Sequence, residues 1–177
     1  MPRVQPIRRE NAVGQVAATL DAVKAKIGKV PNLVATFANS PAVLNAYLGF
    51  SEALSAGRLS AEQREVIALA VGQANSCQYC LSAHTLIAKG VGLSEWSILE
   101  ARAGRGEDPK TDAIVKLAVK VVNQRGRLTD ADVGAARDAG LDDELITEVI
   151  GHVALNTLTN YTNHIAVTDV DFPVVEL

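Results

Sequence analysis

The sequence predicts an all-α fold, a bundle of about eight to nine helices that forms a single domain over residues 1–177. Two observations lead to this prediction. Apolar residues recur at helical spacing along most of the chain, and residues that favour helix starts precede these segments. No segment alternates apolar and polar residues as a half-buried strand would. The short valine runs, such as the one at residues 119–122, lie within helical periodicity.

The first half of the chain is expected to hold an extended arm and five helices. Ser40 followed by Pro41 marks one helix start, because serine caps helices and proline suits their first turn. Ser60 and Gln63 mark another start as a capping box. Gly90 is expected just beyond the end of the fifth helix, as its C′ glycine. The expected segments are the arm at 1–9 and helices at about 11–27, 33–38, 41–57, 61–74 and 77–90.

The second half is expected to hold four helices and an extended tail. Ser94 is placed to cap a short helix, and a polar connector with two glycines and a proline follows it at residues 103–109. The next segment is strongly amphipathic. The expected helices start at Ser94 and then span about 111–124, 129–139 and 142–167, before a tail at 169–177.

Short sequence echoes suggest that the bundle consists of two loosely related helical halves. Gly57-Arg58-Leu59-Ser60 recurs as Gly126-Arg127-Leu128-Thr129, and each copy ends one helix and caps the next. Glu148, Asn160 and Asn163 have the same separations as Glu65, Cys77 and Cys80. The second half would then carry asparagine where the first carries cysteine.

Composition narrows the classes of function. The formal net charge of −3 provides no basic surface, so nucleic acid is not an expected partner. No apolar run approaches the roughly 20 residues of a membrane span, and the first residues lack the order of a signal peptide. A cytoplasmic protein is therefore expected. Structural disulfides are rare in that compartment, so a Cys-x-x-Cys pair there favours catalysis or metal binding.

The two cysteines of the chain are Cys77 and Cys80, and His84 follows one helical turn later. On a helix these three side chains share one face. Glu65 lies about 15 Å before the expected break at Asn75-Ser76, and His84 lies about 12–13 Å after it, at the helical rise. In an antiparallel hairpin Glu65 and His84 can therefore face each other.

This set of side chains suits thiol redox chemistry. A carboxylate orients an imidazole, and the imidazole takes a proton from a thiol. The thiolate is the reactive form, and an expected helix N-terminus at Cys77 and Cys80 favours it. Attack on a peroxide would produce a sulfenic acid, which condenses with the second thiol to a disulfide.

The spacing of Glu65, Cys77, Cys80 and His84 resembles the alkyl hydroperoxidase D-like group of the carboxymuconolactone decarboxylase superfamily. The resemblance covers a core motif region at about residues 41–92. It is weaker in three flanking segments, which are similar to the peroxidase-related branch. These are Lys29-Val30-Pro31-Asn32-Leu33, Asn160-Tyr161-Thr162-Asn163-His164 and Asp171-Phe172-Pro173.

The resemblance implies roles for the four residues. Cys80 would attack a small hydroperoxide or a partner disulfide, Cys77 would resolve the product as a disulfide, and His84 with Glu65 would relay protons. It also implies a homo-oligomer, a trimer or hexamer. A thiol or lipoyl-type reductant, or a peroxiredoxin partner, would take part in electron transfer, and no cofactor or metal is implied. Tyr79 stands where a well-known subgroup has histidine, and could support the site only by hydrogen bonding, because its ordinary pKa is near 10.

Other interpretations stay open on sequence alone. A decarboxylase acting on a cyclic lactone acid would not need the thiol pair. A non-enzymatic helical assembly protein would hold both cysteines as inert core residues. Cys77, Cys80, His84 and Glu65 are also acceptable zinc ligands, although three of them would crowd one helical stripe. His152 and His164 are expected in structural or subunit-contact roles.

Overall fold

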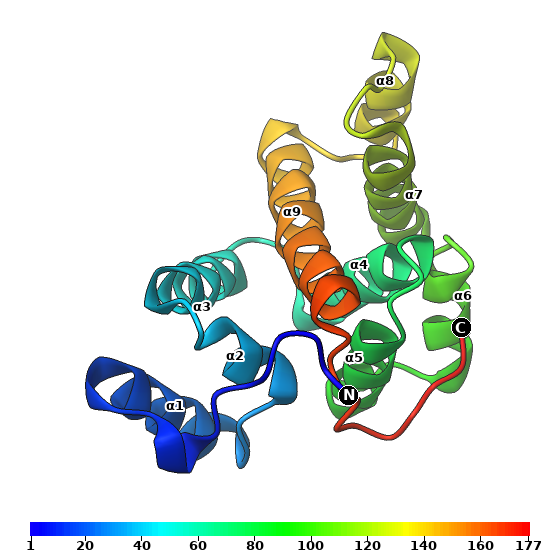
Figure 1. Ribbon diagram of the computed structural model, residues 1–177. Coiled ribbons are helices and arrows are strands. Elements are labelled where there is room, and N and C mark those ends of the chain that lie inside the picture. The colour runs from blue at the N-terminus through cyan, green and yellow to red at the C-terminus, as the bar shows by residue number, and fades with distance from the viewer.

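The chain folds into nine α-helices and one short 3₁₀ turn, with no β-strand (Figure 1). The computed structural model describes residues 1–177. The all-α prediction is confirmed. The elements are η1 (Arg9–Asn11), α1 (Gly14–Ile27), α2 (Asn32–Phe37), α3 (Pro41–Ser55), α4 (Ala61–Ala74), α5 (Gln78–Gly90), α6 (Glu95–Arg102), α7 (Pro109–Gln124), α8 (Asp130–Asp138) and α9 (Asp143–Ala166).

Helix starts follow the local capping chemistry. The Ser40 side chain accepts a hydrogen bond from the Val43 amide, and Pro41 opens α3. Ser60 and Gln63 form the expected capping box at the start of α4. Capping satisfies amides that the first helical turn would leave unpaired, so these starts are determined within a few residues of sequence.

Three local expectations were wrong. Gly90 is the last residue of α5, and the chain instead reverses at Gly92, whose φ of +100° suits glycine. A 3₁₀ turn interrupts the expected arm at Arg9–Asn11. Helix α7 begins at Pro109, two residues early, because the Asp108 carboxylate accepts hydrogen bonds from the first helical amides.

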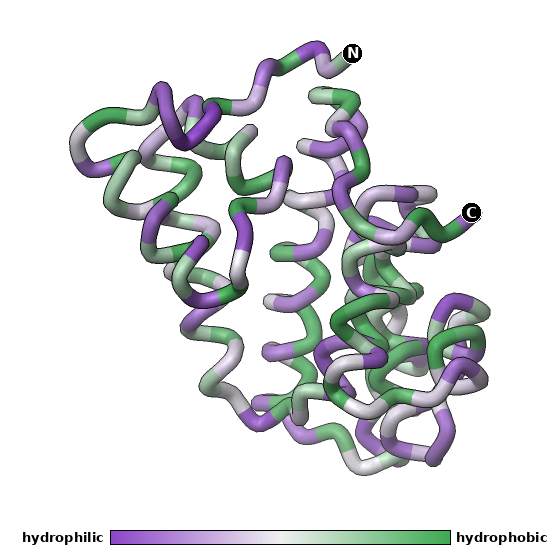
Figure 2. The backbone as a smooth tube through the Cα atoms, turned by 90° about the horizontal axis from the view of Figure 1, so that it is seen from below, coloured by the Kyte–Doolittle hydropathy of each residue, from purple (hydrophilic) through white to green (hydrophobic).

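Helix α4 lies at the centre of the molecule, and α5, α6, α7 and α9 pack around it (Figure 1). Every residue from Val66 to Gly72 in α4 is buried. Figure 2 shows hydrophobic and hydrophilic residues interspersed along most of the helices. No helix combines the length and apolar character that crossing a bilayer requires.

One of three hydrophobic clusters joins the N-terminal helices to the start of α5. It contains Cys77, Tyr79 and Cys80 together with buried residues of α1, α2 and α3. Phe172 of the C-terminal tail packs against the same cluster. The two thiols thus lie where the first three helices, the α4–α5 hairpin and the tail meet.

Candidate active site

The turn between α4 and α5 places Cys77 directly before the first residue of α5. Ser76 adopts a left-handed conformation with φ of +54°, which reverses the chain. The Cys77 amide then donates to the Gly72 carbonyl over 2.8 Å. Cys77 is the N-cap of α5, and its sulfur accepts a hydrogen bond from the Cys80 amide at 3.4 Å. Both thiols therefore lie at a helix N-terminus, where the helix dipole favours a thiolate.

The two thiols are free and face each other. Their sulfur atoms are 2.7 Å apart, close to the roughly 2.05 Å of a disulfide bond, and the Cys77 thiol donates to Cys80. Cys77 is 1% exposed and Cys80 is 2% exposed. The pair can form an intramolecular disulfide with little movement, but solvent scarcely touches either sulfur.

Glu65 of α4 and His84 of α5 meet across the hairpin, as the spacing predicts. The Glu65 carboxylate oxygen Oε2 lies 2.8 Å from His84 Nδ1. Their side chains keep 14% and 23% of their surface exposed. Because Nδ1 is engaged with Glu65, Nε2 is the nitrogen left to exchange a proton with a reacting group.

Charges and hydrogen bonds make the two thiols unequal. The hydrogen bond from Cys77 lowers the pKa of Cys80 to about 6, although burial opposes this, and the nearby charge of His84 adds to it. The same hydrogen bond, with burial, raises the pKa of Cys77. Burial lowers the pKa of His84, but the Glu65 carboxylate outweighs burial and the pKa is raised. Cys80 is therefore the thiolate and Cys77 the proton-bearing partner.

Helix α9 supplies polar side chains that the sequence marked only as an echo of the cysteine spacing. Asn163 Nδ2 lies 3.3 Å from Cys80 Sγ and 3.9 Å from Cys77 Sγ. The Thr159 hydroxyl lies 4.0 Å from Cys80 Sγ. Asn160 accepts a hydrogen bond from Asn75 in the hairpin turn at 2.9 Å. The asparagines at echo positions thus lie against the hairpin that holds the cysteines, and whether the two halves are related stays a prediction.

Glu148, which occupies the position in the second half that matches Glu65 in the first, lies in different surroundings from Glu65. Its carboxylate accepts hydrogen bonds from the amides of Arg58 and Leu59 over 2.8 to 3.1 Å. A Cβ on Gly57 would lie 2.7 Å from the same carboxylate, so a larger residue there would have to displace the end of the Glu148 side chain. Glu148 therefore ties α9 to the α3–α4 loop and faces no thiol.

Tyr79 does not reach the thiols with its hydroxyl. The hydroxyl donates to Asp171 Oδ1 at 2.8 Å and accepts from the Leu33 amide at 3.1 Å. Its ring meets Phe172 edge-on, with centroids 5.6 Å apart, and burial raises its pKa. Lys29 completes this arrangement by pairing with Asp171 at 3.2 Å. Tyr79 supports the site by hydrogen bonding, as expected, but its partners are Leu33 and Asp171, so it holds α2 and the tail against α5 and does not bond to a thiol.

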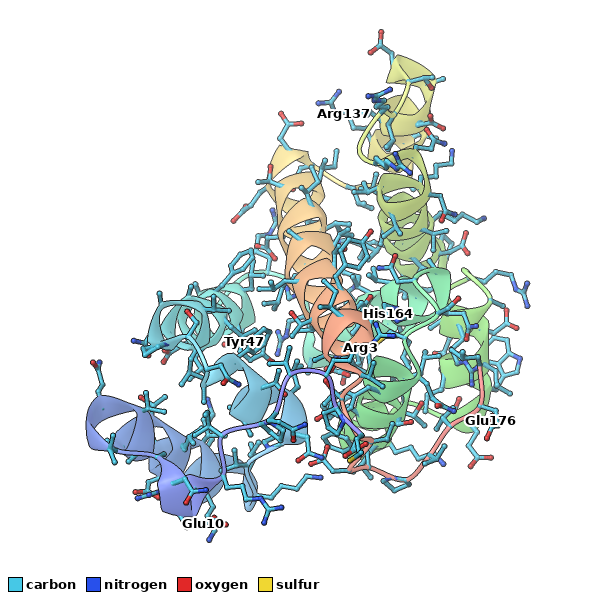
Figure 3. All side chains as sticks on the ribbon, in the orientation of Figure 1. Arg3, Glu10, Tyr47, Arg137, His164 and Glu176 are labelled. Atoms are coloured by element: carbon cyan, nitrogen blue, oxygen red, sulfur yellow. The ribbon has the colours of Figure 1, made fainter.

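Tyr47 is a neighbour of the site that the sequence did not distinguish from an ordinary apolar helix position. It lies on α3, and its ring packs against Phe37 with centroids 4.9 Å apart (Figure 3). Burial raises its pKa, and the charges of Cys80 and then Glu65 raise it further. Its hydroxyl therefore lies within electrostatic reach of both the thiolate and the proton relay.

The remaining histidines lie on α9 at two different depths. His164 lies near the end of α9 (Figure 3). Its Nε2 is 2.8 Å from the Asn75 carbonyl and so holds the hairpin turn. His152 is 4% exposed, and burial lowers its pKa. Neither is hydrogen-bonded to a thiol, and their structural or subunit-contact roles stay a prediction.

The four predicted site residues pair off and do not converge on one point. Glu65 holds His84, Cys77 faces Cys80, and no group of three or more potential ligands is arranged to hold a metal ion. Two open surface pockets, of about 560 and 410 Å³, lie at the N-terminal arm and between the starts of α4, α6 and α7. Neither is lined by a cysteine. The geometry suits two-electron thiol chemistry better than a zinc site.

Comparison with known proteins gives one family match. The model of the carboxymuconolactone decarboxylase family matches residues 41–107, which hold all four predicted residues. No curated protein matches the chain.

Several solved structures share the whole fold. An uncharacterised peroxidase-related protein with an alkylhydroperoxidase AhpD core, from Ralstonia eutropha, superposes with a TM-score of 0.86 at 24% identity, covering 96% of this chain and 92% of that one. A peroxidase-related protein from Silicibacter sp. gives 0.83 at 20% identity, covering 94% and 92%. The debrominase Bmp8, as a cysteine-to-alanine variant in complex with 2,3,4-tribromopyrrole, gives 0.80 at 18% identity, covering 96% and 91%.

Proposed function

We propose that this chain, which matches the model of the carboxymuconolactone decarboxylase family over residues 41–107 and has the alkylhydroperoxidase D-like fold, is a thiol-dependent peroxidase that reduces small hydroperoxides. One observation carries the proposal. The Cys80 sulfur lies 2.7 Å from a second thiol that donates a hydrogen bond to it, beside a His84–Glu65 pair. That arrangement supplies a nucleophile, a resolving thiol and a proton donor.

In the first step the Cys80 thiolate attacks the terminal oxygen of the hydroperoxide. The sulfur–oxygen bond forms as the oxygen–oxygen bond breaks, and the leaving alkoxide takes a proton from the His84 imidazolium. The products are a Cys80 sulfenic acid and one molecule of alcohol. Glu65 raises the pKa of His84, which favours the protonated imidazole that this step needs.

In the second step the Cys77 sulfur attacks the sulfenic sulfur. The disulfide forms and the hydroxyl leaves as water, with the proton of the Cys77 thiol. An external dithiol, such as a lipoyl-type reductant, then reduces the disulfide by exchange and is itself oxidised. A peroxiredoxin that draws electrons from this pair is an alternative partner. We also propose that the protein works as a homo-oligomer, a trimer or hexamer.

Burial favours a compact substrate. Cys77 and Cys80 keep 1% and 2% of their surface exposed, whereas His84 reaches solvent. Hydrogen peroxide or a short alkyl hydroperoxide needs less opening of the site than a bulky one. A partner disulfide on a protein surface needs a larger opening of the chain.

The decisive experiment measures peroxide consumption with a dithiol reductant in the native protein and in two single variants. Cys80→Ser is expected to abolish turnover. Cys77→Ser is expected to retain one reaction per chain and to accumulate a sulfenic acid that a dimedone probe traps. Native protein that keeps both free thiols after peroxide treatment, without the loss of two hydrogens in its mass, would contradict the proposal.

The debrominase neighbour favours a second candidate, reductive removal of bromine from an aromatic ring. The Cys80 thiolate would take bromine from the ring as a sulfenyl bromide while the ring carbon takes a proton. Cys77 would then displace bromide and close the disulfide. Tribromopyrrole supplied to the reduced protein tests this, since bromide release in step with thiol loss would support it.

Lactone decarboxylation is the third candidate, and it needs no sulfur. Activity toward a cyclic lactone acid that survives in a Cys77→Ser, Cys80→Ser double variant would support it. The same double variant should be inactive if the protein is a peroxidase or a debrominase, so it distinguishes the thiol-dependent functions from decarboxylation.

A further inference from the structure

The core-facing side of α9 changes character along its length. Its first turns bury Leu145, Val149 and Val153 in the largest hydrophobic cluster. From the middle of the helix onward, the buried side chains are mostly polar, namely His152, Asn156, Thr159, Asn160 and Asn163. Burying polar groups without hydrogen-bond partners destabilises the folded protein, so we looked for partners of these side chains outside α9.

Two amides on this stripe have hydrogen-bonding atoms left without a protein partner. Asn160 is fully buried and its Nδ2 has none, and Asn163 is 6% exposed and its Oδ1 has none. Each buried group left unpaired in this way destabilises the folded protein. Their other amide atoms are engaged, because Asn160 Oδ1 accepts from Asn75 and Asn163 Nδ2 donates to the thiols. The hydrogen bonds that these two amides do make therefore go to the α4–α5 hairpin and its thiols, and not to other residues of α9.

We propose that Asn163, supported by Asn160, is a positioning residue that selects Cys80 as the attacking sulfur. The proposal rests on the thiol function proposed above and extends it to α9. Asn163 Nδ2 is 3.3 Å from Cys80 Sγ but 3.9 Å from Cys77 Sγ, so its stronger hydrogen bond goes to Cys80. A donor to a charged acceptor is worth more than one to a neutral acceptor, so this asymmetry favours negative charge on Cys80.

The unpartnered atoms suit the product of the first step. A sulfenic acid on Cys80 adds one oxygen and one hydrogen at the sulfur, which can accept from an amide N–H and donate to an amide oxygen. Asn160 supplies the free donor and Asn163 the free acceptor on the same face of α9. The amides would hold the sulfenic acid while Cys77 attacks its sulfur.

The test compares alkylation of the two cysteines by iodoacetamide in the reduced protein as a function of pH, with each site quantified by peptide mass spectrometry. Asn163→Leu removes the donor, and Asn163→Asp replaces it with an acceptor of the same shape. Asn156→Leu is the matched control, because Asn156 is a buried amide on the same stripe that donates to the His152 carbonyl and contacts no sulfur. The titratable groups near Cys80, namely Tyr47, Cys77, Tyr79 and His84, are unchanged in all three variants.

Asn163→Leu is expected to slow Cys80 alkylation at neutral pH by about tenfold and to move its midpoint toward that of an ordinary thiol. The preference for Cys80 over Cys77 should fall with it. Asn163→Asp should show a larger shift, because its carboxylate repels the thiolate. Asn156→Leu should keep the native midpoint and the native ratio of labelling.

Circular dichroism confirms that each variant folds, and Asn163→Asp keeps the test valid if the leucine variant does not. A native midpoint and labelling ratio in folded Asn163→Asp would overturn the proposal, as would an equal shift in Asn156→Leu. The readout needs no peroxide. If the native protein did not turn over peroxide, the proposed function would be wrong, but the effect of Asn163 on Cys80 alkylation could still be measured.

Discussion

At the scale of single residues, the two sulfurs of the site differ in protonation: the surroundings favour a thiolate on Cys80 and a thiol on Cys77. Cys77 keeps its proton and donates it toward Cys80, and the Cys80 pKa is lowered to about 6 while that of Cys77 is raised. His84 stands one turn away with a raised pKa because Glu65 faces it. The two cysteines are similar in the sequence, and their different surroundings make one the nucleophile and the other its partner.

The pH dependence of the peroxide reaction follows from that difference in protonation. Below its lowered pKa, Cys80 is protonated and unreactive, so the second-order rate constant should fall about tenfold per unit of pH on the acid side. Above that pKa the rate should level off, well below the pH at which an ordinary thiol ionises. Stopped-flow mixing of reduced protein with hydrogen peroxide, at pH values on both sides of the Cys80 pKa, measures this rate constant. A rate that climbs only near the pKa of a free cysteine would show that Cys80 is not activated.

Glu65→Gln tests the proton relay. The amide cannot hold the imidazolium, so the pKa of His84 should fall and the charge that favours the Cys80 thiolate should be lost. Peroxide turnover at neutral pH is expected to drop by about a hundredfold, within the range that general acid–base catalysis contributes. Glu62→Gln, an exposed change in the first turn of the same helix, is the control and should keep native turnover. Equal activity in both variants would remove Glu65 from the mechanism.

At the scale of elements, α5 is held at its start by segments far away in the sequence. The Tyr79 hydroxyl connects the first turn of α5 to α2 and to the tail, where Asp171 also pairs with Lys29. The segments around Lys29, Tyr79 and Asp171 carried part of the family resemblance. In the structure these segments meet at the Tyr79 hydroxyl and the Asp171 carboxylate, and together they hold the start of α5 in place.

Tyr79→Phe should therefore act on stability rather than on thiol chemistry. Loss of the hydroxyl leaves Asp171 and the Leu33 amide without their partner, at a cost of about 1–3 kcal/mol in the free energy of unfolding. Amides of the tail should exchange hydrogen faster, while the pH midpoint of Cys80 alkylation stays native. Tyr161→Phe, on the exposed face of α9, serves as the control for removing a hydroxyl. A changed midpoint in Tyr79→Phe would show that the Tyr79 hydroxyl does act on the thiol pair.

At the scale of the whole molecule, α4 organises the core and α9 closes it over the thiols. The opposite face of α9 is apolar and open to solvent, with Ile150 48%, Leu158 40%, Tyr161 54% and Ile165 67% exposed. These residues follow helical spacing along a single stripe. A contiguous apolar stripe of this kind is typical of a surface that another protein covers.

The proposed homo-oligomer predicts that copies of the chain meet through this stripe. Light scattering of the purified protein should then give a mass of three or six chains. Leu158→Glu should reduce it to a single chain, because a charge there would be buried without a partner. Val13→Glu, on the exposed start of the chain, is the control and should leave the mass unchanged. A native protein that is monomeric at all concentrations would contradict the prediction.

The sequence by itself determined the fold class, most helix limits and the pairing of Glu65 with His84. These depend on local chemistry: caps such as Ser60 with Gln63 act over three residues, and the hairpin distance follows from the helical rise. Gly90 shows the limit of such reasoning. Two glycines stood near the end of α5, and only the packed chain decided that the reversal comes at Gly92.

Only the tertiary structure decided the surroundings of the thiols. Asn163 and Thr159 reach Cys80 from about 80 residues away, and Tyr79 turns to Asp171, 92 residues on. Periodicity shows which face of a helix is buried, but the rotation and depth of α9 against the α4–α5 hairpin depend on how all the helices pack together. The cysteine motif is therefore legible in the sequence, whereas the burial and the charge that distinguish Cys80 from Cys77 arise only in the assembled core.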